Sequence, residues 1–425
     1  MIVIVMDTTR ADRLGPYGSE RATTPRIDAF VRDCEVYDRA WSTSSWTLPA
    51  HASMLTGLYP TRHGAYNRPD RDPDSLGKNP PRLADSFETL AERLAAHGYH
   101  TAAFAGAGWL APEFGLLQGY AVQDAENLRD IPAEELTTRA LAWLDGVPPD
   151  EPLHLLVNYF DPHGPYEPPE GYDVFPGAKD PPPAKLDPAA LAKLTAEQLA
   201  VEFGKIMGPT LARYDGEILY TDDQIGRLLD HLRELGRYDE ALIFIVADHG
   251  EGFGGHGVLG HGAWLYETVL RIPFIVHRPG GRGAGTRVVA PVSLVDMLPI
   301  VAEETGLELP ADLDAVPVGE RTLVLAEEMP SALFKKRMKR LDRDLVAGIR
   351  WPFKLILNFP GPRELYRLDR DPREGENLAD GAREAELEQR VLQAVSALEP
   401  AAAPEAPRPM SDTARERLRS LGYIE

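Results

Sequence analysis

The chain has 425 residues, of which 43% are hydrophobic and 26% are charged. These values describe a globular protein with room for one large or two unequal domains and a sizeable core. The formal net charge of −21 argues against non-specific nucleic-acid binding and repels anionic ligands at long range. The single cysteine, Cys34, excludes an internal disulfide and a cysteine-based metal site.

The sequence contains no apolar run long enough to span a membrane and no secretory leader before its first predicted strand, so we expect no integral membrane segment. Because the chain opens abruptly on a strand, the compartment stays open. It is cytoplasmic for the chain as given, and periplasmic or secreted if a leader has been removed. The oligomeric state is equally open.

The first predicted element is the apolar, β-branched run Ile2-Val3-Ile4-Val5-Met6, a pattern typical of a strand buried on both faces of a parallel sheet. Asp7 follows at its carboxyl end, where open α/β sheets place their sites. Residues 24–31 predict a short capped helix, and residues 36–41 predict a return to the sheet.

A second helix is predicted from Thr47, which suits an N-cap, through Pro49 in the first turn to Gly57 at the exit. The start of a helix offers unpaired N–H groups and the positive end of a dipole, so it attracts an anion. A hydroxyl placed there is easier to deprotonate, especially beside a metal ion.

Helices and strands then alternate. Strands are predicted at residues 99–105, 153–160, 241–247 and 273–276, and helices at 87–97, 136–144, 194–235 (with Gly208-Pro209 as a candidate break) and 292–304. Proline-rich residues 71–85 and 164–190 predict surface loops, and the variable loops 65–80 and 164–190 are expected to meet the leaving group.

This alternation predicts an α/β fold with a mostly parallel central sheet flanked by helices, over residues 1–319. Residues 320–400 predict a small antiparallel sheet, with strands near 322–326, 345–349 and 354–358, followed by a helix over 382–398. Residues 401–425 predict a Pro/Ala linker and a terminal helix.

Three separated elements present side chains suited to a divalent metal: Asp7 and Asp248-His249 after buried strands, and Thr47 at a helix start. The glycine-rich loop from Asp248 to Gly257 gains little stability from its polar residues, which favours a functional reading. Within it, Glu251 and His256 are alternative ligands or outer residues. Mixed oxygen and nitrogen ligands suit zinc or manganese better than calcium.

Two further histidines follow the same pattern. His163 lies just past the end of the strand over 153–160, and His261 lies between glycines that let the backbone approach a ligand closely. Together with the metal candidates, these imidazoles suit binding of anion oxygens, a second metal, or protonation of a leaving group.

The chain resembles the sulfatase branch of the alkaline phosphatase superfamily over nearly its whole length. The matching stretches are residues 6–12, 47–53, 55–64, 161–166, 248–251, 265–273 and 364–368, with Asp371-Pro372 and Asn377-Leu378. The resemblance implies the family's α/β fold, an esterase activity and a metal centre.

The sequence departs from that family at the catalytic position. Sulfatases carry Cys or Ser in a Cys-x-Pro-Ser-Arg pattern, whereas this chain has Thr47-Leu48-Pro49-Ala50-His51, and threonine cannot become formylglycine. The Lys and His of the sulfatase Gly-Lys-Trp-His segment are absent from residues 106–109, and His261 replaces a later lysine. Threonine nucleophiles are familiar in relatives that handle phosphate, so the resemblance implies phosphoryl chemistry.

The hypothesis is a metal-dependent hydrolase of phosphate mono- or diesters, with a small anionic ester as substrate and a covalent phospho-threonine at Thr47. Asp7, Thr47, Asp248 and His249 hold one metal. His163 and His261 bind phosphate oxygens, and one of them protonates the leaving group. A second metal on Asp161, His163 and His261 is the alternative arrangement.

His51 either activates the hydrolytic water or packs on its helix. Three other functions remain open: a sulfuric ester hydrolase without formylglycine, a transferase that moves a phospho group to a lipid or glycan, and a non-catalytic binding protein on an enzyme scaffold.

Overall fold

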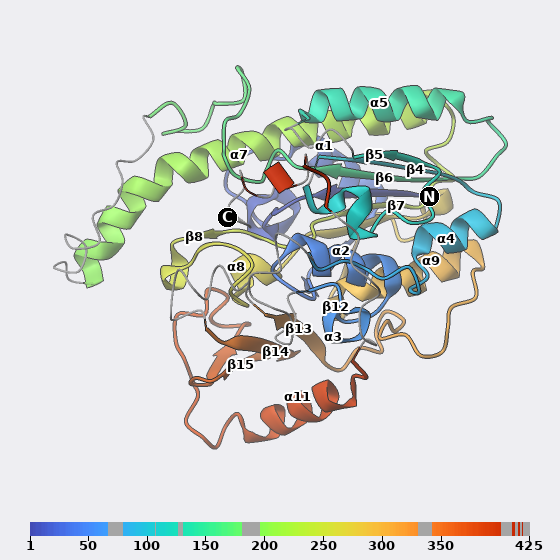
Figure 1. Cartoon of the computed structure of the whole chain (residues 1–425). Coiled ribbons are helices and arrows are strands. Elements are labelled where there is room, and N and C mark those ends of the chain that lie inside the picture. Colours follow the sequence, from blue (N-terminus) through green and yellow to red (C-terminus); the bar gives the residue numbers. More distant parts are fainter. Residues whose placement is uncertain are drawn as a thin grey trace.

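The computed structural model describes residues 1–66, 80–106, 108–125, 131–180, 196–329, 342–400, 410–412, 415, 416 and 419, with backbone alone for 196–206. At its centre is an eight-stranded sheet of order β11-β2-β10-β7-β1-β6-β4-β5 (Figure 1). The strands are β1 (Ile2–Met6), β2 (Glu35–Tyr37), β4 (His100–Ala105), β5 (Val122–Asp124), β6 (Leu153–Tyr159), β7 (Ile243–Val246), β10 (Phe274–His277) and β11 (Thr286–Val288).

Strand β1 lies in the middle of this sheet, parallel to β6 on one side and β7 on the other. Strand β10 is antiparallel to both of its neighbours, β7 and β2. The other pairs are parallel, so the predicted mostly parallel sheet is confirmed. All five residues of β1 are buried, as its unbroken apolar sequence predicts.

Helices cover both faces of the sheet (Figure 1). The helices of this part of the chain are α1 (Pro25–Phe30), α2 (Thr47–Thr56), α3 (Pro60–His63), α4 (Leu90–Ala96), α5 (Ala133–Gly146), α7 (Ala196–Glu234), α8 (Glu267–Leu270) and α9 (Met297–Thr305). Alternate residues of β1 point to opposite faces: Ile2 and Ile4 pack with α1, α5 and α7, whereas Val3 and Val5 pack with α2, α4 and α9. The sheet therefore separates two hydrophobic cores.

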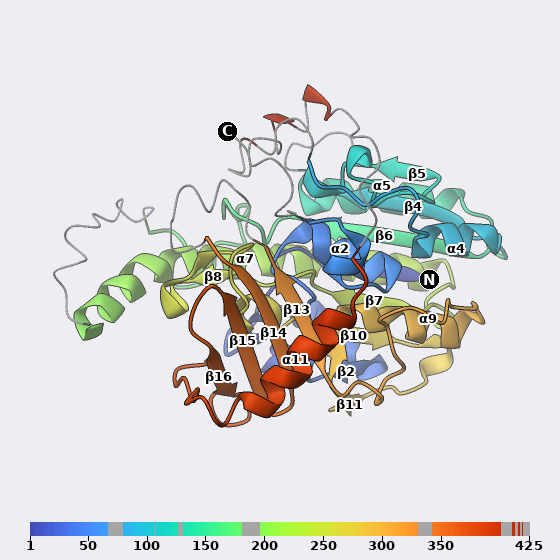
Figure 2. The ribbon, with the colours of Figure 1, turned by 60° about the horizontal axis from the view of Figure 1, so that its bottom comes forward.

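A second, four-stranded antiparallel sheet follows in the chain, in the order β13-β14-β15-β16, with α11 (Ala385–Ala397) lying across it (Figure 2). Its strands are β13 (Val324–Glu328), β14 (Asp344–Arg350), β15 (Phe353–Phe359) and β16 (Glu364–Arg367). This C-terminal sheet and helix confirm the predicted architecture and add β16, a strand too short to give a clear period. The domain limits at 319 and 400 stay predictions, and residues 401–409 lie outside the described part.

Three sequence predictions were wrong in detail. The strand predicted over 36–41 is two strands, because β3 (Ala40–Trp41) leaves the main sheet to pair with β12 (Val292–Ser293). For the same reason α9 begins five residues later than predicted. Helix α7 continues through Pro209. A proline inside a helix costs about 3 kcal/mol, and the packing of the helix after Pro209 offsets this cost.

Two smaller features complete the fold. The short helix α3 follows α2, and β8 (Gly252–Phe253) pairs with β9 (Leu259–Gly260) in a two-stranded sheet. In the part of the chain that the structure describes, no helix combines the length and apolar character that crossing a bilayer requires.

Candidate active site

The carboxyl ends of three adjacent strands, β7, β1 and β6, bring the candidate residues together. In the sheet register Val5 lies opposite both Val246 and Asn158. Asp7 directly follows β1 and Asp248 comes two residues after β7, so both carboxylates emerge at the same edge of the sheet. This is the edge at which parallel α/β sheets place their ligands.

The turn after β1 is fixed by Thr8, whose φ of +51° is strained for a β-branched residue. Its N–H donates to Asp248 Oδ1 at 3.1 Å, its hydroxyl donates to the carbonyl of Pro162 at 2.9 Å, and its carbonyl accepts from the Tyr214 hydroxyl at 2.8 Å. These three bonds hold the strained backbone and tie together the ends of β1, β6 and β7.

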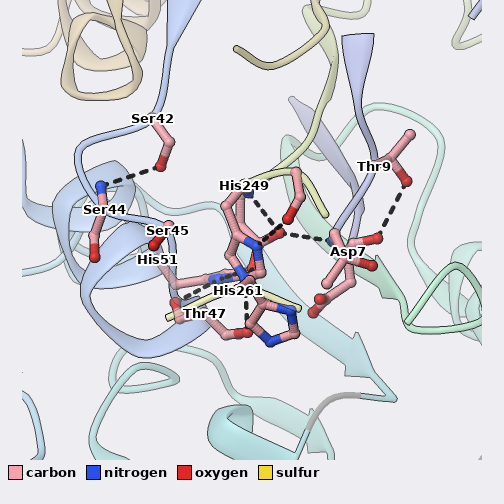
Figure 3. Close-up of polar contacts among 12 residues, drawn as sticks. Asp7, Thr9, Ser42, Ser44, Ser45, Thr47, His51, His249 and His261 are labelled. Atoms are coloured by element: carbon pink, nitrogen blue, oxygen red, sulfur yellow. Dashed lines mark hydrogen bonds and ion pairs between the residues drawn. The ribbon is translucent and has the colours of Figure 1, made fainter. Parts of the chain in front are cut away.

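Helix α2 brings Thr47 to this edge from another part of the chain. The expectation that Thr47 caps the helix was wrong by one residue: Trp46 is the extended N-cap and Thr47 is the first helical residue. The Thr47 hydroxyl makes no capping bond. Its Oγ1 instead lies 3.3 Å from His249 Nε2 (Figure 3).

Asp7, Asp248 and His249 form a compact group whose potential ligand atoms all lie within 4.8 Å of one another. All three side chains are fully buried, and Asp7 Oδ1 and Asp248 Oδ2 accept no hydrogen bond. Enclosing carboxylate oxygens without partners is costly unless a cation compensates them. The three residues therefore fit a divalent metal ion.

The ring orientation of His249 supports the same conclusion. Its Nδ1 lies 2.9 Å from the carbonyl oxygen of Gly250 and donates to it, so Nε2 presents its lone pair toward Thr47 and Asp248. Burial lowers the pKa of His249 to about 4. A neutral imidazole with a fixed tautomer is the form that binds metals.

The two carboxyl groups differ in charge preference. Burial, followed by the nearby Asp248 charge, raises the pKa of Asp7 well above its usual range. Burial also acts to raise the pKa of Asp248, but the neighbouring His249 and His51 and the N–H donors of Thr8 and His249 lower it overall. A bound cation would relieve the repulsion between the two carboxylates.

His51 lies beneath this group, one helical turn after Thr47. Its Nδ1 is 3.0 Å from the Thr47 carbonyl oxygen and 3.5 Å from Asp248 Oδ2, and its Nε2 is 3.1 Å from Asn158 Oδ1. Asn158 in turn donates from Nδ2 to Asp7 Oδ2 at 3.3 Å. Through its two ring nitrogens, His51 therefore contacts the first turn of α2, Asp248 and Asn158 of β6.

His163 and His261 lie side by side, with ring centroids 5.0 Å apart, and the ring of His261 is 4.6 Å from that of His249. His261 Nδ1 is 3.2 Å from both oxygens of Glu251, a carboxylate that also accepts the Tyr166 hydroxyl at 2.9 Å. The structure therefore brings both predicted histidines close to the group of Asp7, Asp248 and His249, and Glu251 contacts His261.

These contacts shift the pKa values of the two imidazoles in opposite directions. Burial disfavours charged His261, but the Glu251 carboxylate outweighs it and raises the pKa of His261. Burial, with His261 as the next cause, lowers the pKa of His163 to about 3. One imidazole that favours its neutral form and one that favours its charged form suit an anion whose oxygens need both a hydrogen-bond donor and a counter-charge.

Two other candidates, Asp161 and His256, do not belong to the group of Asp7, Asp248 and His249. Asp161 accepts the N–H of Ala133 at 3.0 Å, and among the described residues the one group of three or more potential ligands excludes Asp161, His163 and His261. His256 stacks on Tyr266 with centroids 4.0 Å apart. Of the variable loops, residues 67–79 and 181–195 lie outside the described part.

Sequence reasoning missed Asn158, although a lone amide in an otherwise apolar strand is a signal that a buried polar partner is near. It also missed Glu328, which is fully buried at the end of β13 and bonds to the segment before α2. No local pattern marks Glu328, since its partners are more than 280 residues away.

The family model described as Sulfatase matches residues 1–307. The chain belongs to the sulfatase family. Enzymes of this family are metal-dependent hydrolases, so this chain is a sulfatase-family hydrolase, and the predicted membership and enzyme class are confirmed.

This sulfatase-family chain is 24% identical to the uncharacterized sulfatase YidJ of Escherichia coli K12, an alignment covering 93% of this chain and 86% of that protein. It is 28% identical to the multifunctional alkaline phosphatase superfamily protein PehA of Trinickia caryophylli, covering 78% of each. Among solved structures, a phosphonate monoester hydrolase of Agrobacterium radiobacter superposes with a TM-score of 0.73 at 22% identity, covering 93% of this chain and 94% of the other.

Proposed function

We propose that this sulfatase-family enzyme hydrolyses phosphate esters through a covalent phospho-threonine at Thr47. The observation that carries the proposal is the 3.3 Å approach of Thr47 Oγ1 to His249 Nε2, at the start of α2 and beside the metal group. A hydroxyl in that position meets both the metal candidates and the N-terminal dipole of its helix.

Asp7, Asp248, His249 and the Thr47 oxygen would hold the ion, which when bound would lower the pKa of the hydroxyl and withdraw charge from the ester oxygens. The set of two carboxylates, one imidazole and one hydroxyl suits zinc or manganese.

The protein groups then act as follows. Thr47 Oγ1, whose proton passes to solvent, attacks phosphorus while the bond from phosphorus to the leaving oxygen breaks. His163 and the cationic His261 bind non-bridging oxygens, and His261 gives a proton to the leaving oxygen. Water next gives a proton to His261 as its oxygen attacks the phosphorus of the phospho-threonine and the bond from phosphorus to Thr47 Oγ1 breaks. A monoester substrate thereby yields inorganic phosphate and a diester yields a phosphate monoester, and Thr47 regains its proton from solvent. His51 acts as a positioning residue, because its two nitrogens already face Thr47, Asp248 and Asn158.

Phosphorus esters are favoured over sulfate esters because threonine lacks the second hydroxyl through which a formylglycine hydrate expels sulfate. A phospho-threonine can instead be cleaved by water at phosphorus. The similarity of the fold to phosphonate monoester hydrolases of Agrobacterium radiobacter and Silicibacter pomeroyi supports a phosphorus-centred substrate.

The second candidate is sulfuric ester hydrolysis without formylglycine. It is favoured by the relatives described as sulfatases, including an arylsulfatase of Clostridium perfringens that is 22% identical over 89% of each chain. Rates on an aryl phosphate, an aryl phosphodiester and an aryl sulfate, measured side by side, separate the two candidates. A dominant rate on the sulfate would replace our proposal.

The nucleophile is tested by Thr47→Ala and Thr47→Ser. We expect Thr47→Ala to reduce kcat by roughly a thousandfold or more, because a covalent route loses its attacking atom. Metal content measured by mass spectrometry should persist, since Asp7, Asp248 and His249 remain. Thr47→Ser keeps a hydroxyl and should form a phospho-enzyme that acid quenching can trap. Ordinary turnover by Thr47→Ala would exclude the covalent mechanism.

A further inference from the structure

The segment before α2, Ser42-Thr43-Ser44-Ser45, is made entirely of hydroxyl residues and is fully buried. Buried hydroxyl and N–H groups need partners, and this segment lies outside any helix or strand for most of its length. Its position decides where α2 begins, and therefore where the Thr47 hydroxyl points. The partners of this segment are thus as important to the site as the helix itself.

One carboxylate oxygen supplies most of those partners. Glu328 Oε2 accepts the Ser44 hydroxyl at 2.9 Å, the Ser45 hydroxyl at 2.9 Å and the Ser45 N–H at 3.1 Å. Glu328 is the last residue of β13, in the C-terminal sheet. Three donors converging on a single buried oxygen form a rigid anchor, because losing the acceptor would leave all three unpaired.

Ser45 connects this anchor to two parts of the candidate site, the start of α2 and the loop of His261. It lies two residues before Thr47, and its carbonyl oxygen accepts the N–H of Gly262 at 2.7 Å. Gly262 directly follows His261. A shift of Ser45 would therefore displace the start of α2 and the loop of His261 together, even though Glu328 bonds to neither Thr47 nor His261.

We propose that Glu328 is a positioning residue of the active site, through which the C-terminal sheet holds Thr47 and His261 in register with each other. The inference rests on the proposed function, in that Thr47 and His261 are taken to act on the ester. It assigns the C-terminal sheet a part in catalysis as well as in stability.

The adjacent Glu327 supplies a matched control. It is also buried at the end of β13, but its side chain accepts from the Thr61 N–H at 2.9 Å and the Thr61 hydroxyl at 2.6 Å, at α3. Glu327→Ala and Glu328→Ala thus each remove one buried carboxylate from the same strand. Only Glu328→Ala removes the anchor of Ser45.

We expect Glu328→Ala to lower kcat roughly tenfold or more, since small misplacements of reacting groups cost large factors in rate, while KM and metal content change little. Glu328→Gln keeps an acceptor oxygen and should restore kcat to within about threefold of wild type. Glu327→Ala should lower the melting temperature but keep kcat within about threefold. If Glu328→Ala fails to fold, the Ser44→Ala/Ser45→Ala variant, which removes two of the three donors, replaces it.

Hydrogen exchange provides a readout that needs no substrate. The amides of residues 42–47 should exchange faster in Glu328→Ala than in Glu327→Ala. Unchanged exchange there, an unchanged kcat in Glu328→Ala, or an equal loss of kcat in Glu327→Ala would each overturn the proposal. If exchange rises as expected but wild-type protein hydrolyses no phosphate or sulfate ester, the proposed function fails while the anchoring by Glu328 stands.

Discussion

At the scale of single residues, the candidate site is a group of buried polar side chains, and the burial of each is explained by its neighbours in the group. Asp7 Oδ1 and Asp248 Oδ2 are enclosed and accept no hydrogen bond, and His249 turns its unprotonated nitrogen toward Asp248. A soluble fold tolerates such a group when a cation binds it, because each isolated buried charge carries a large desolvation cost. A divalent ion bound as proposed would therefore stabilise the fold.

The first residue-scale prediction concerns the metal. Adding zinc or manganese should raise the melting temperature of wild-type protein, because an ion that binds only the folded state stabilises it. Asp7→Asn should abolish this shift and the bound metal. Without metal, Asp7→Asn should melt above wild type, since it removes carboxylate repulsion. Asp12→Asn is the control, because Asp12 pairs with Arg10 near the surface. A full metal shift in Asp7→Asn would exclude Asp7 as a ligand.

A second residue-scale prediction concerns pH. Burial raises the pKa of Glu217 to about 8, with the nearby Asp161 charge as a further cause, and its Oε1 accepts the Glu167 N–H at 2.7 Å. An acid whose folded pKa is raised stabilises the fold most below its unfolded pKa of 4.5, and this stability is lost as pH rises toward 8.

We therefore expect the unfolding free energy of wild type to fall between pH 4.5 and 8 by a contribution that Glu217→Gln lacks. The difference should be on the order of a few kcal/mol, at about 1.4 kcal/mol per unit of pKa. Urea unfolding at pH 5 and pH 8.5 measures it. Parallel pH profiles for the two proteins would show that Glu217 does not titrate in this range.

At the scale of elements, the site depends on where helices start and stop. Helix α2 starts at the active site and ends at Gly57, whose φ of +75° is the left-handed conformation that glycine adopts readily. A Cβ at Gly57 would lie 2.9 Å from Leu298 Cδ2, on α9. Residue 57, at the end of α2, must therefore adopt a left-handed backbone conformation and leave the space beside Leu298 free.

Gly57→Ala should lower the unfolding free energy by about 2–3 kcal/mol, the sum of a positive-φ cost and an overpacking cost. Gly306 is the matched control: it ends α9 with a φ of +73°, and a Cβ there would meet nothing within 4 Å. Gly306→Ala should thus cost only about 1 kcal/mol. Equal losses in urea unfolding would show that contact with Leu298 contributes nothing.

At the scale of the whole molecule, the net charge of −21 surrounds a site proposed to bind an anion. The Debye length falls from about 30 Å at 0.01 M salt to about 8 Å at 0.15 M, so long-range repulsion of substrate weakens as salt is added. Local groups, the metal candidates and His261, would then provide the attraction at short range.

We expect kcat/KM for a dianionic aryl phosphate to rise severalfold over that salt range, with kcat nearly constant. A monoanionic aryl phosphodiester should respond less, because its charge is half as large. Steady-state kinetics at several sodium chloride concentrations test this. A fall of kcat/KM with salt would mean that the field at the entrance is positive despite the negative total.

Much of this architecture was predictable from local pattern. The unbroken apolar run of β1 and its following Asp7 predicted a central strand ending at a site, and the glycine-rich loop at Asp248 predicted a second contributor. These signals are local because burial on both faces of a strand, and the chemistry of strand ends, are properties of a few consecutive residues. The split between β2 and β3 was not predictable, because the alternation of side chains along a strand is the same whichever strand it pairs with.

The sequence by itself determined which residue types stand at strand ends and helix starts, since each depends on its immediate neighbours. Only the tertiary structure decided which of them meet. It placed β1 between β6 and β7, turned His51 onto Asn158, and brought Glu328 to Ser45. The physical reason is that contacts between distant segments depend on strand order and on how the two sheets pack, and these arise from the sum of many side-chain contacts rather than from any one stretch of chain.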